Sequence, residues 1–376
     1  MAGIYLHIPF CKQACHYCDF HFSTTRKNQR KMVDAMLAEL RLRNPEWSYG
    51  PVETIYFGGG SPSLLTPGEL ADLMEAIQKD YGIRGDAEVT LEVNPDDVNT
   101  TSLRDWRSAG VNRLSIGVQS FDDHILKWMN RAHDGEQALA SIHQAKDAGF
   151  ENLTMDLIYG LPDMDNVAWG RAIQKFISLD IPHLSAYTLT IESGTVFGHR
   201  VKKGKMEVAV DTRVAAQMIM LYELMGSEGY EAYEVSNFAK DGMYAKHNTS
   251  YWQGVDYMGI GPSAHSLFGE VRSWNISNNN LYIKELLQEH RRPYTAENLT
   301  LYDRYNEYVM TRLRTQWGCN LIEIQSKFGE SFLNIFQSEL RQIDPHHFRE
   351  QGGNIVLTPE GRCVSDHIAS SLFASE

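Results

Sequence analysis

Short apolar runs alternate with longer amphipathic stretches along the first half of the chain. The runs are rich in β-branched and aromatic residues, as buried strands are, and the stretches between them repeat apolar residues at helical spacing. The six runs are IYLHI (4–8), ETIYFG (53–58), AEVTLEV (87–93), NRLSIGV (112–118), NLTMDLIYG (152–160) and PHLSAYTL (182–189). Strands separated by helices pair in parallel through right-handed crossovers. The pattern predicts an α/β fold built on a partial (β/α)6 barrel, because a full TIM barrel needs eight such repeats.

The alternation fades after about residue 200, which predicts three regions. Residues 1–200 form the partial barrel, and residues 201–298 form a connecting region with a helix near 211–226 and a basic helix. The tail, residues 299–376, shows three helical patterns, the short apolar run GGNIVLT (352–358) and a final helix. This order is compatible with a small, mainly α-helical, winged-helix-like domain.

Composition and charge narrow the classes of function. Hydrophobic residues make up 43% and charged residues 22% of the 376 residues, which is ordinary for a globular protein with a sizeable core. The formal net charge of −13 works against binding to nucleic acid, since phosphate backbones require a surface of lysine and arginine. No apolar run approaches the roughly 18 residues that span a bilayer, and the first residues do not resemble a signal peptide. We therefore expect a cytoplasmic protein without a nucleic-acid partner.

Three of the five cysteines lie close together near the N-terminus. Cys11, Cys15 and Cys18 form the spacing Cys-x3-Cys-x2-Cys. In a reducing compartment such a group is more often a metal or redox site than a disulfide framework. Three thiolates in one loop can hold three corners of a 4Fe–4S cluster and leave the fourth iron open to a small molecule. Two alternatives are a dithiol redox pair at Cys15 and Cys18 and a zinc site completed by neighbouring histidines.

Glycine and polar residues stand at the ends of several predicted strands. In a barrel of this type, ligand-binding residues come from the carboxyl ends of the strands and the loops that follow them. After the second strand, the glycines in Gly58–Ser61 let the backbone approach a ligand, and the lack of a Gly-Lys-Ser/Thr sequence disfavours a phosphate loop. Glu92, Gln119 and Asp156 stand near the ends of the third, fourth and fifth strands. We expect these residues to converge with the cysteines on one rim.

The cysteine spacing resembles the signature of the radical S-adenosylmethionine (SAM) superfamily. In that superfamily, the amino and carboxylate groups of the methionyl part of SAM chelate the open iron, and an electron passed into the sulfonium releases a 5′-deoxyadenosyl radical. The resemblance implies that the glycine-rich segment, here Gly59, Gly60 and Ser61, contacts the methionyl amino group. Threonine is usual at the last of these positions, and Ser61 keeps its hydroxyl.

Longer blocks resemble the oxygen-independent coproporphyrinogen dehydrogenases and their relatives over nearly the whole chain. The blocks are YLHIPFCKQACHYC, YFGGGSPS, EVNPDD, GVQSF, MNRAHD and DLIYGLP, in this order. The resemblance implies a SAM pocket in which carboxylate and amide side chains hydrogen-bond the ribose and methionyl groups. The implied pocket residues are Tyr5, Tyr17, Gly59, Gly60, Ser61, Glu92, Gln119, Arg131 and Asp156.

Two features separate the chain from the dehydrogenases and are similar to the HemW group of heme chaperones. Phe20 stands where the dehydrogenases carry a further cysteine, and their longer N-terminal extension is missing. The segment HNTSYW, from His247 to Trp252, is similar to the His-Asn-x-x-Tyr-Trp motif of that group, and a Gly-x-Gly-x-x-Ala-His segment at Gly259–His265 follows it. The resemblance implies that His247, Tyr251 and Trp252 contact heme, the histidine by axial or covalent bonding and the aromatic rings by packing on the macrocycle.

The resulting hypothesis is a cytoplasmic heme chaperone that binds a 4Fe–4S cluster, SAM and heme and delivers heme to apo-hemoproteins of the respiratory type. A flavodoxin-like protein or NAD(P)H is the expected electron donor, and transient contact with a membrane protein is compatible with this role. Whether SAM is cleaved, and hence whether the protein is an enzyme, is open at this point. The first alternative is a coproporphyrinogen III dehydrogenase that carries out oxidative decarboxylation of propionates. The second is a zinc-dependent winged-helix binding protein.

Overall fold

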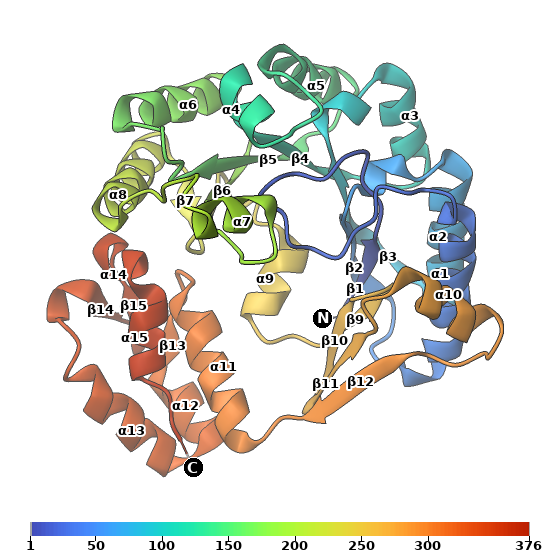
Figure 1. The fold of residues 1–376 in the computed structure, drawn as a ribbon. Helices are drawn as coiled ribbons and strands as arrows, with labels where there is room; N and C mark the ends of the chain where they lie inside the picture. Colours follow the sequence, from blue (N-terminus) through green and yellow to red (C-terminus); the bar gives the residue numbers. More distant parts are fainter. Residues whose placement is uncertain (1, 376) are drawn as a thin grey trace.

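The computed structural model describes residues 2–375 and centres on one mixed sheet of twelve strands (Figure 1). Six of these strands pair in parallel in sequence order, so that each lies beside the next one along the chain. They are β1 (Gly3–Ile8), β2 (Val52–Gly59), β3 (Ile83–Val93), β4 (Arg113–Gln119), β5 (Asn152–Tyr159) and β6 (His183–Thr188). Each overlaps one of the predicted runs, and the predicted partial (β/α)6 barrel is confirmed.

Helices cover the outer face of these six strands (Figure 1). They are α1 (Gln29–Arg43), α2 (Pro67–Asp80), α3 (Thr100–Ser108), α4 (Asp123–Trp128), α5 (Gly135–Asp147) and α6 (Asn166–Ser178). Their apolar faces share one hydrophobic core with the strands, as Leu70, Leu73 and Ile77 of α2 do. A capping box starts α2, in which the Thr66 hydroxyl accepts from the Glu69 N–H and the Glu69 carboxylate accepts from the Thr66 N–H. Side-chain caps of this kind, at the starts of α2 to α6, fix where the preceding loops end.

The sheet continues at both edges with six short strands. They are β7 (Glu231–Ala232), β8 (Asn237–Ala239), β9 (Tyr257–Ile260), β10 (His265–Phe268), β11 (Val271–Asn275) and β12 (Tyr294–Asn298). At one edge β8 pairs antiparallel with β6, and at the other β9 pairs parallel with β1. Residues 201–298, predicted to be a connecting region, therefore contribute strands to the barrel sheet. Strands of two to five residues are too short for a clear alternating pattern, and the edges offered by β1 and β6 determine their pairing.

Four helices accompany these short strands. They are α7 (Val196–Lys202), α8 (Asp211–Ser227), α9 (Lys246–Trp252) and α10 (Asn279–Leu287). α8 packs on α6 and α10 packs on α1, so both extend the outer layer. α9 lies instead on the inner side of the sheet and packs on β2 (Figure 1). The helix that carries the HNTSYW segment is therefore an internal element of the barrel.

The C-terminal residues form a second hydrophobic core that includes Tyr305, Val309 and Phe336. Five helices and a three-stranded antiparallel sheet surround it. These elements are α11 (Leu301–Leu313), β13 (Cys319–Asn320), α12 (Leu321–Phe328), α13 (Glu330–Leu340), β14 (Phe348–Gln351), β15 (Asn354–Leu357), α14 (Pro359–Cys363) and α15 (Ser365–Ser371). The combination of helices with a β-hairpin agrees with the predicted winged-helix-like pattern. The predicted single strand is the second arm of the hairpin, and the predicted final helix is two helices.

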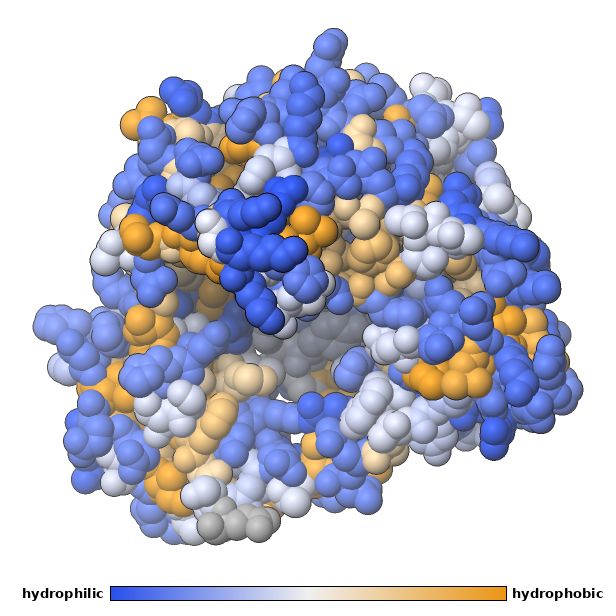
Figure 2. Space-filling model, in the orientation of Figure 1, coloured by the Kyte–Doolittle hydropathy of each residue, from blue (hydrophilic) through white to orange (hydrophobic). Residues whose placement is uncertain are grey.

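Short 3-10 helices and a central hollow complete the fold. The 3-10 helices are η1 (Asn44–Glu46), η2 (Pro62–Leu64), η3 (Pro95–Asp97) and η4 (Pro345–His347). Figure 2 shows a mostly hydrophilic face that is hollowed at its centre, between the barrel helices and the C-terminal helices. Within residues 2–375, no helix is both long and apolar enough to cross a membrane.

Candidate cofactor-binding site

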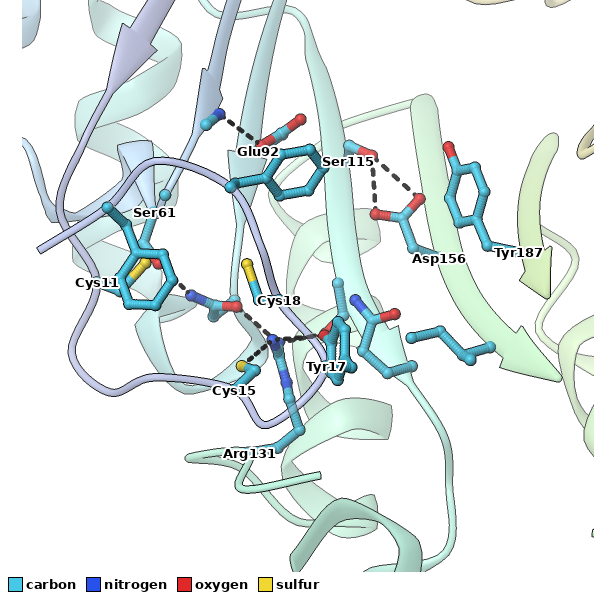
Figure 3. Close-up of a pocket in the computed structure, with 18 of the residues that line it drawn as sticks. Cys11, Cys15, Tyr17, Cys18, Ser61, Glu92, Ser115, Arg131, Asp156 and Tyr187 are labelled. Carbon is cyan, nitrogen blue, oxygen red and sulfur yellow. Dashed lines mark hydrogen bonds between the residues drawn. The ribbon is translucent and has the colours of Figure 1, made fainter. Parts of the chain in front are cut away.

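A cavity of about 540 Å³ opens at the carboxyl ends of the parallel strands. Its walls come from the cysteine loop and from the ends of β2 to β6, as the strand-end rule predicted (Figure 3). The residues predicted for the cluster and for SAM that line this cavity are Cys11, Cys15, Tyr17, Cys18, Gly59, Gly60, Ser61, Glu92, Gln119, Arg131 and Asp156. Tyr5 is the exception, because its ring lies behind Tyr56 and its hydroxyl lies 3.2 Å from His7 Nδ1.

The two ends of the cysteine loop are bonded to each other just beyond the end of β1. The Cys11 N–H donates to the Ser23 carbonyl at 3.0 Å, and the Ser23 N–H donates to the Pro9 carbonyl at 3.0 Å. The His7 Nε2 lies 2.8 Å from the His21 carbonyl, and burial lowers the pKa of His7 to about 4. The neutral His7 ring therefore donates this bond and ties the far end of the loop to the strand.

The middle of the same loop is held by the segment that follows α4. The Gln13 side chain donates to the Asn130 carbonyl at 2.6 Å, and the Asn130 side chain donates to the Ala14 carbonyl at 2.7 Å. The His16 N–H donates to the Met129 carbonyl at 3.0 Å. With its ends and its middle both fixed, the loop presents its three sulfurs to the cavity (Figure 3).

The three thiols are free and only partly exposed. Burial raises the pKa of Cys11 to about 11 and that of Cys18 to about 12, so both are protonated until a metal displaces the proton. Across residues 2–375, no three His, Cys, Asp or Glu side chains already stand in a metal-binding arrangement. In a cubane each thiolate binds a different iron, so the three sulfurs need not converge on one metal ion. The donor set itself, three thiols in one loop, fits three corners of a 4Fe–4S cluster.

The histidines that favoured a zinc site have other partners. Besides the bond of His7 to the His21 carbonyl, His16 Nδ1 lies 2.8 Å from the Trp128 carbonyl, and His21 Nε2 lies 2.7 Å from Asn279 Oδ1. Each ring thus fixes the loop to another element. Among residues 2–375, these histidines and cysteines form no group of three that could hold one zinc ion.

Arg131 connects the cysteine loop to the ends of two strands (Figure 3). Its Nη2 donates to Asn94 Oδ1 at 2.6 Å and to the Gly117 carbonyl at 2.8 Å, and its Nη1 lies 3.4 Å from Cys15 Sγ. Asn94 in turn donates to the Ser61 hydroxyl at 2.8 Å. One chain of hydrogen bonds therefore runs from the glycine-rich segment to the cysteine loop, and it ends with the guanidinium beside Cys15 Sγ.

The glycine-rich segment needs its glycines for two reasons. Gly59 has φ +107°, which strains any other residue, and a Cβ on Gly60 would lie 2.6 Å from the Phe10 carbonyl oxygen. The Ser61 N–H donates to this same Phe10 carbonyl at 2.7 Å. The segment therefore lies directly against the start of the cysteine loop, as a site shared by a cluster and its ligand requires.

Two carboxyl groups, at the ends of β3 and β5, line the same cavity. Glu92 accepts from the Tyr56 hydroxyl at 2.8 Å and from the Gly59 N–H at 3.2 Å, and Asp156 accepts from the Ser115 hydroxyl at 3.3 Å. Burial raises the pKa of Glu92 to about 7 and that of Asp156 to about 6. Both groups thus change charge close to neutral pH, which is characteristic of functional sites.

Gln119 reaches the cavity through an irregular strand end. Its φ is +65°, and the pairing of β4 with β5 shifts register between Ile116 and Gln119. Bulges of this kind redirect a side chain at the end of a strand. Non-glycine residues with a positive φ are strained, and such residues cluster at binding sites.

The residues predicted to contact heme lie apart from these. His247 is 2% exposed, its Nδ1 lies 2.8 Å from Thr54 Oγ1, and its Nε2 lies 2.7 Å from the Tyr251 hydroxyl. Both imidazole nitrogens are thus engaged inside the protein. Trp252 lies at the end of α9 with the Arg314 guanidinium 5.7 Å from its ring centre. The three residues share one helix but do not line the cavity, and their contact with heme stays a prediction.

Several residues of the cavity wall were not predicted from the sequence. Asn94 follows β3 two positions after Glu92, so the strand-end rule could have identified it. Asn248 comes from α9, beyond the region where the strand and helix pattern was clear. The other missed side chains include Tyr56, Arg113, Ser115 and Tyr187.

Comparison with known proteins agrees with this site. Residues 5–174 match the family model described as the radical SAM superfamily. The chain is 32% identical over 372 residues to the heme chaperone HemW of Bacillus subtilis, covering 98% of both chains. It is 32% identical over 376 residues to the heme chaperone HemW of Mycobacterium tuberculosis, covering 99% of this chain and 94% of that one.

A solved structure shares the fold over nearly the whole chain. The coproporphyrinogen III oxidase HemN from Escherichia coli, described as a radical SAM enzyme, superimposes with a TM-score of 0.84. The two are 22% identical, and the match covers 99% of this chain and 90% of that one, so it shows the fold alone. Since the identity to the HemW relatives extends over the full length and the fold is that of a radical SAM protein, the chain belongs to the HemW family of the radical SAM superfamily.

Proposed function

We propose that this protein is a heme chaperone that binds a 4Fe–4S cluster, SAM and heme and delivers heme to respiratory apo-hemoproteins. The observation that carries the proposal is that three thiols and the strand-end polar groups share one cavity in a chain of the HemW family. Cys11, Cys15 and Cys18 would hold the cluster. When bound, the cluster supplies an open iron for the methionyl group and an electron for the sulfonium.

The SAM site is proposed on the wall formed by the ends of β2 to β5. Gly59, Gly60 and Ser61 offer backbone and hydroxyl groups to the methionyl end of SAM. Glu92 is suited to accept from the N–H groups of the methionyl amino group or to lie beside the positively charged sulfonium, and Asp156 is suited to ribose hydroxyls. Together these groups would orient SAM with its methionyl end toward the cysteine loop.

Phe20 supports the chaperone proposal over the dehydrogenase alternative. Its side chain is 67% exposed, at the mouth of the cavity where the dehydrogenases carry a further cysteine. The two remaining cysteines are distant, since Cys319 is buried in the C-terminal core and Cys363 lies in α14. The loop therefore supplies three thiols and no more.

Heme binding and delivery are proposed from the family and from the aromatic residues of α9. The His247 imidazole can bind heme iron only by giving up either its bond to Thr54 or its bond to Tyr251. A flavodoxin-like protein or NAD(P)H as electron donor, and contact with a membrane protein during delivery, belong to the same proposal.

The affinity for SAM should depend on the charge of Glu92. Because the pKa of Glu92 is raised to about 7, its carboxylate is present above this pH and is lost as the pH falls through it. We expect the affinity to fall by about tenfold per unit of pH below this point. Glu92→Gln should bind SAM weakly and without this pH dependence. Calorimetric titration of the reconstituted protein measures both, and equal pH profiles of wild type and Glu92→Gln would contradict the assignment.

Two parallel incubations test the function as a whole. After anaerobic cluster reconstitution, the protein is given SAM and a reductant, once with coproporphyrinogen III and once with heme and an apo-hemoprotein. We expect heme to be bound and transferred to the acceptor while the porphyrinogen is left unchanged. Formation of protoporphyrinogen would instead establish the decarboxylating activity and refute the chaperone proposal.

A further inference from the structure

The helix α9 is a fixed part of the barrel interior. Its Asn248 stands on the wall of the cofactor cavity, and the helix packs on β2 (Figure 1). The backbone N–H groups of Lys246 and His247 both donate to the buried Glu88 carboxylate of β3, each at 3.0 Å. The start of the helix is therefore held from within the sheet.

The His247 side chain is equally fixed. Thr54 Oγ1 of β2 lies 2.8 Å from its Nδ1, and the Tyr251 hydroxyl, one turn further along α9, lies 2.7 Å from its Nε2. Burial lowers the pKa of His247 to about 3, so the ring is neutral and offers one donor and one acceptor. Thr54 and Tyr251 therefore occupy both the donor and the acceptor of the ring.

The face of the same imidazole packs against the cavity wall on which we place SAM. Its ring stacks on the ring of Tyr56, with centroids 5.2 Å apart and planes at 27°. The Tyr56 hydroxyl donates to one oxygen of Glu92 at 2.8 Å, and the other oxygen accepts from the Gly59 N–H at 3.2 Å. A continuous path of contacts thus runs from His247 through Tyr56 to the carboxylate and the glycine-rich segment.

We propose that His247 is a positioning residue of the SAM site, which holds the Tyr56 ring so that its hydroxyl fixes Glu92. This inference rests on the proposed function because it takes Glu92 to bind SAM. It gives the histidine of the HNTSYW segment a role that a heme ligand cannot fill at the same time. The imidazole has to stay between Thr54 and Tyr251, with no free nitrogen.

The test measures SAM and heme binding on the same reconstituted variants. His247→Ala removes the ring and is expected to weaken SAM binding by about tenfold, the effect of misplacing a hydrogen bond to a charged group. His247→Gln keeps a planar amide that can bond Tyr251 and lie against the Tyr56 ring, and it should bind SAM within about threefold of wild type. Tyr56→Phe should match His247→Ala, and the double variant should bind no more weakly than either single one, because both break the same path. The exposed His143→Ala of α5 is the matched control.

Two further readouts separate positioning from heme ligation. The change that SAM makes in the electron paramagnetic resonance spectrum of the reduced cluster should be reduced in His247→Ala and restored in His247→Gln. The heme absorption spectrum should stay that of wild type in both variants. Loss of the heme spectrum in both variants with unchanged SAM affinity would overturn the inference and assign the imidazole to heme.

The remaining outcomes are also decisive. Unchanged SAM affinity in both His247→Ala and Tyr56→Phe would show that the contacts from His247 through Tyr56 to Glu92 do not position SAM. If circular dichroism shows that His247→Ala does not fold, the SAM affinities of His247→Gln and Tyr56→Phe test the inference instead. A wild-type protein that holds its cluster but does not bind SAM would refute the proposed function and the inference with it, whereas variants that bind as well as a competent wild type refute the inference alone.

Discussion

Replacing Cys15 by serine is expected to abolish the iron–sulfur cluster of the reconstituted protein, and with it the tight binding of SAM. Serine keeps the size of cysteine but lacks the soft thiolate that these clusters require. Only two protein ligands would remain, because no fourth cysteine lies beside the loop. Iron and sulfide content and the visible absorption after anaerobic reconstitution measure the effect, and all three should fall to background.

Cys363→Ser provides the matched control for this result. This thiol is also half-buried and free, but it lies in α14, where its sulfur contacts the Pro359 carbonyl at 3.5 Å. Full cluster content is expected in this variant. A Cys15→Ser protein that kept its iron and its absorption would show that the Cys-x3-Cys-x2-Cys loop does not hold the cluster.

The central strands could be predicted from the sequence because each one carries apolar residues at alternate positions or more often. Residues two apart lie on the same face of a strand, and Ile55 and Phe57 of β2 and Leu114 and Ile116 of β4 are fully buried on that face. The strands β7 to β12 carry no such signal, because most of them are at the edges and only a few residues long. Their pairing is a property of the assembled sheet, so the inclusion of residues 231–298 in the barrel could not be foreseen.

The residues of the candidate site differ in the same way in how well the sequence predicts them. Residues at the ends of predicted strands, such as Glu92 and Asp156, could be placed on one rim because parallel strands share their carboxyl edge. The position of His247 could not be inferred, since a short polar and aromatic helix is equally compatible with the surface and with the interior. Its burial depends on Glu88 and Thr54, which are distant in the sequence and accept or share hydrogen bonds with α9.

Removing the positive charge of Arg131 is expected to lower the reduction potential of the bound cluster. The guanidinium lies 3.4 Å from Cys15 Sγ and is buried in the wall between the cysteine loop and β4. Reduction adds a negative charge to the cluster, and a fixed cation beside it stabilises the reduced form. At roughly 6 Å and an effective dielectric constant of about 20, this attraction is about 3 kcal/mol, which corresponds to a shift on the order of 100 mV for one electron.

The comparison of Arg131→Met with Arg131→Lys isolates this charge from the hydrogen bonds that Arg131 makes. Both variants lose the paired bonds to Asn94 and the Gly117 carbonyl, and both should loosen the loop to a similar extent. Only the methionine variant loses the charge, so redox titration should show the large negative shift in that variant alone. If both variants shift equally, the position of the loop and not the guanidinium charge sets the potential. If neither shifts, the guanidinium is screened from the cluster, and the chain of bonds from Ser61 through Asn94 to Arg131 serves only to hold the loop in place.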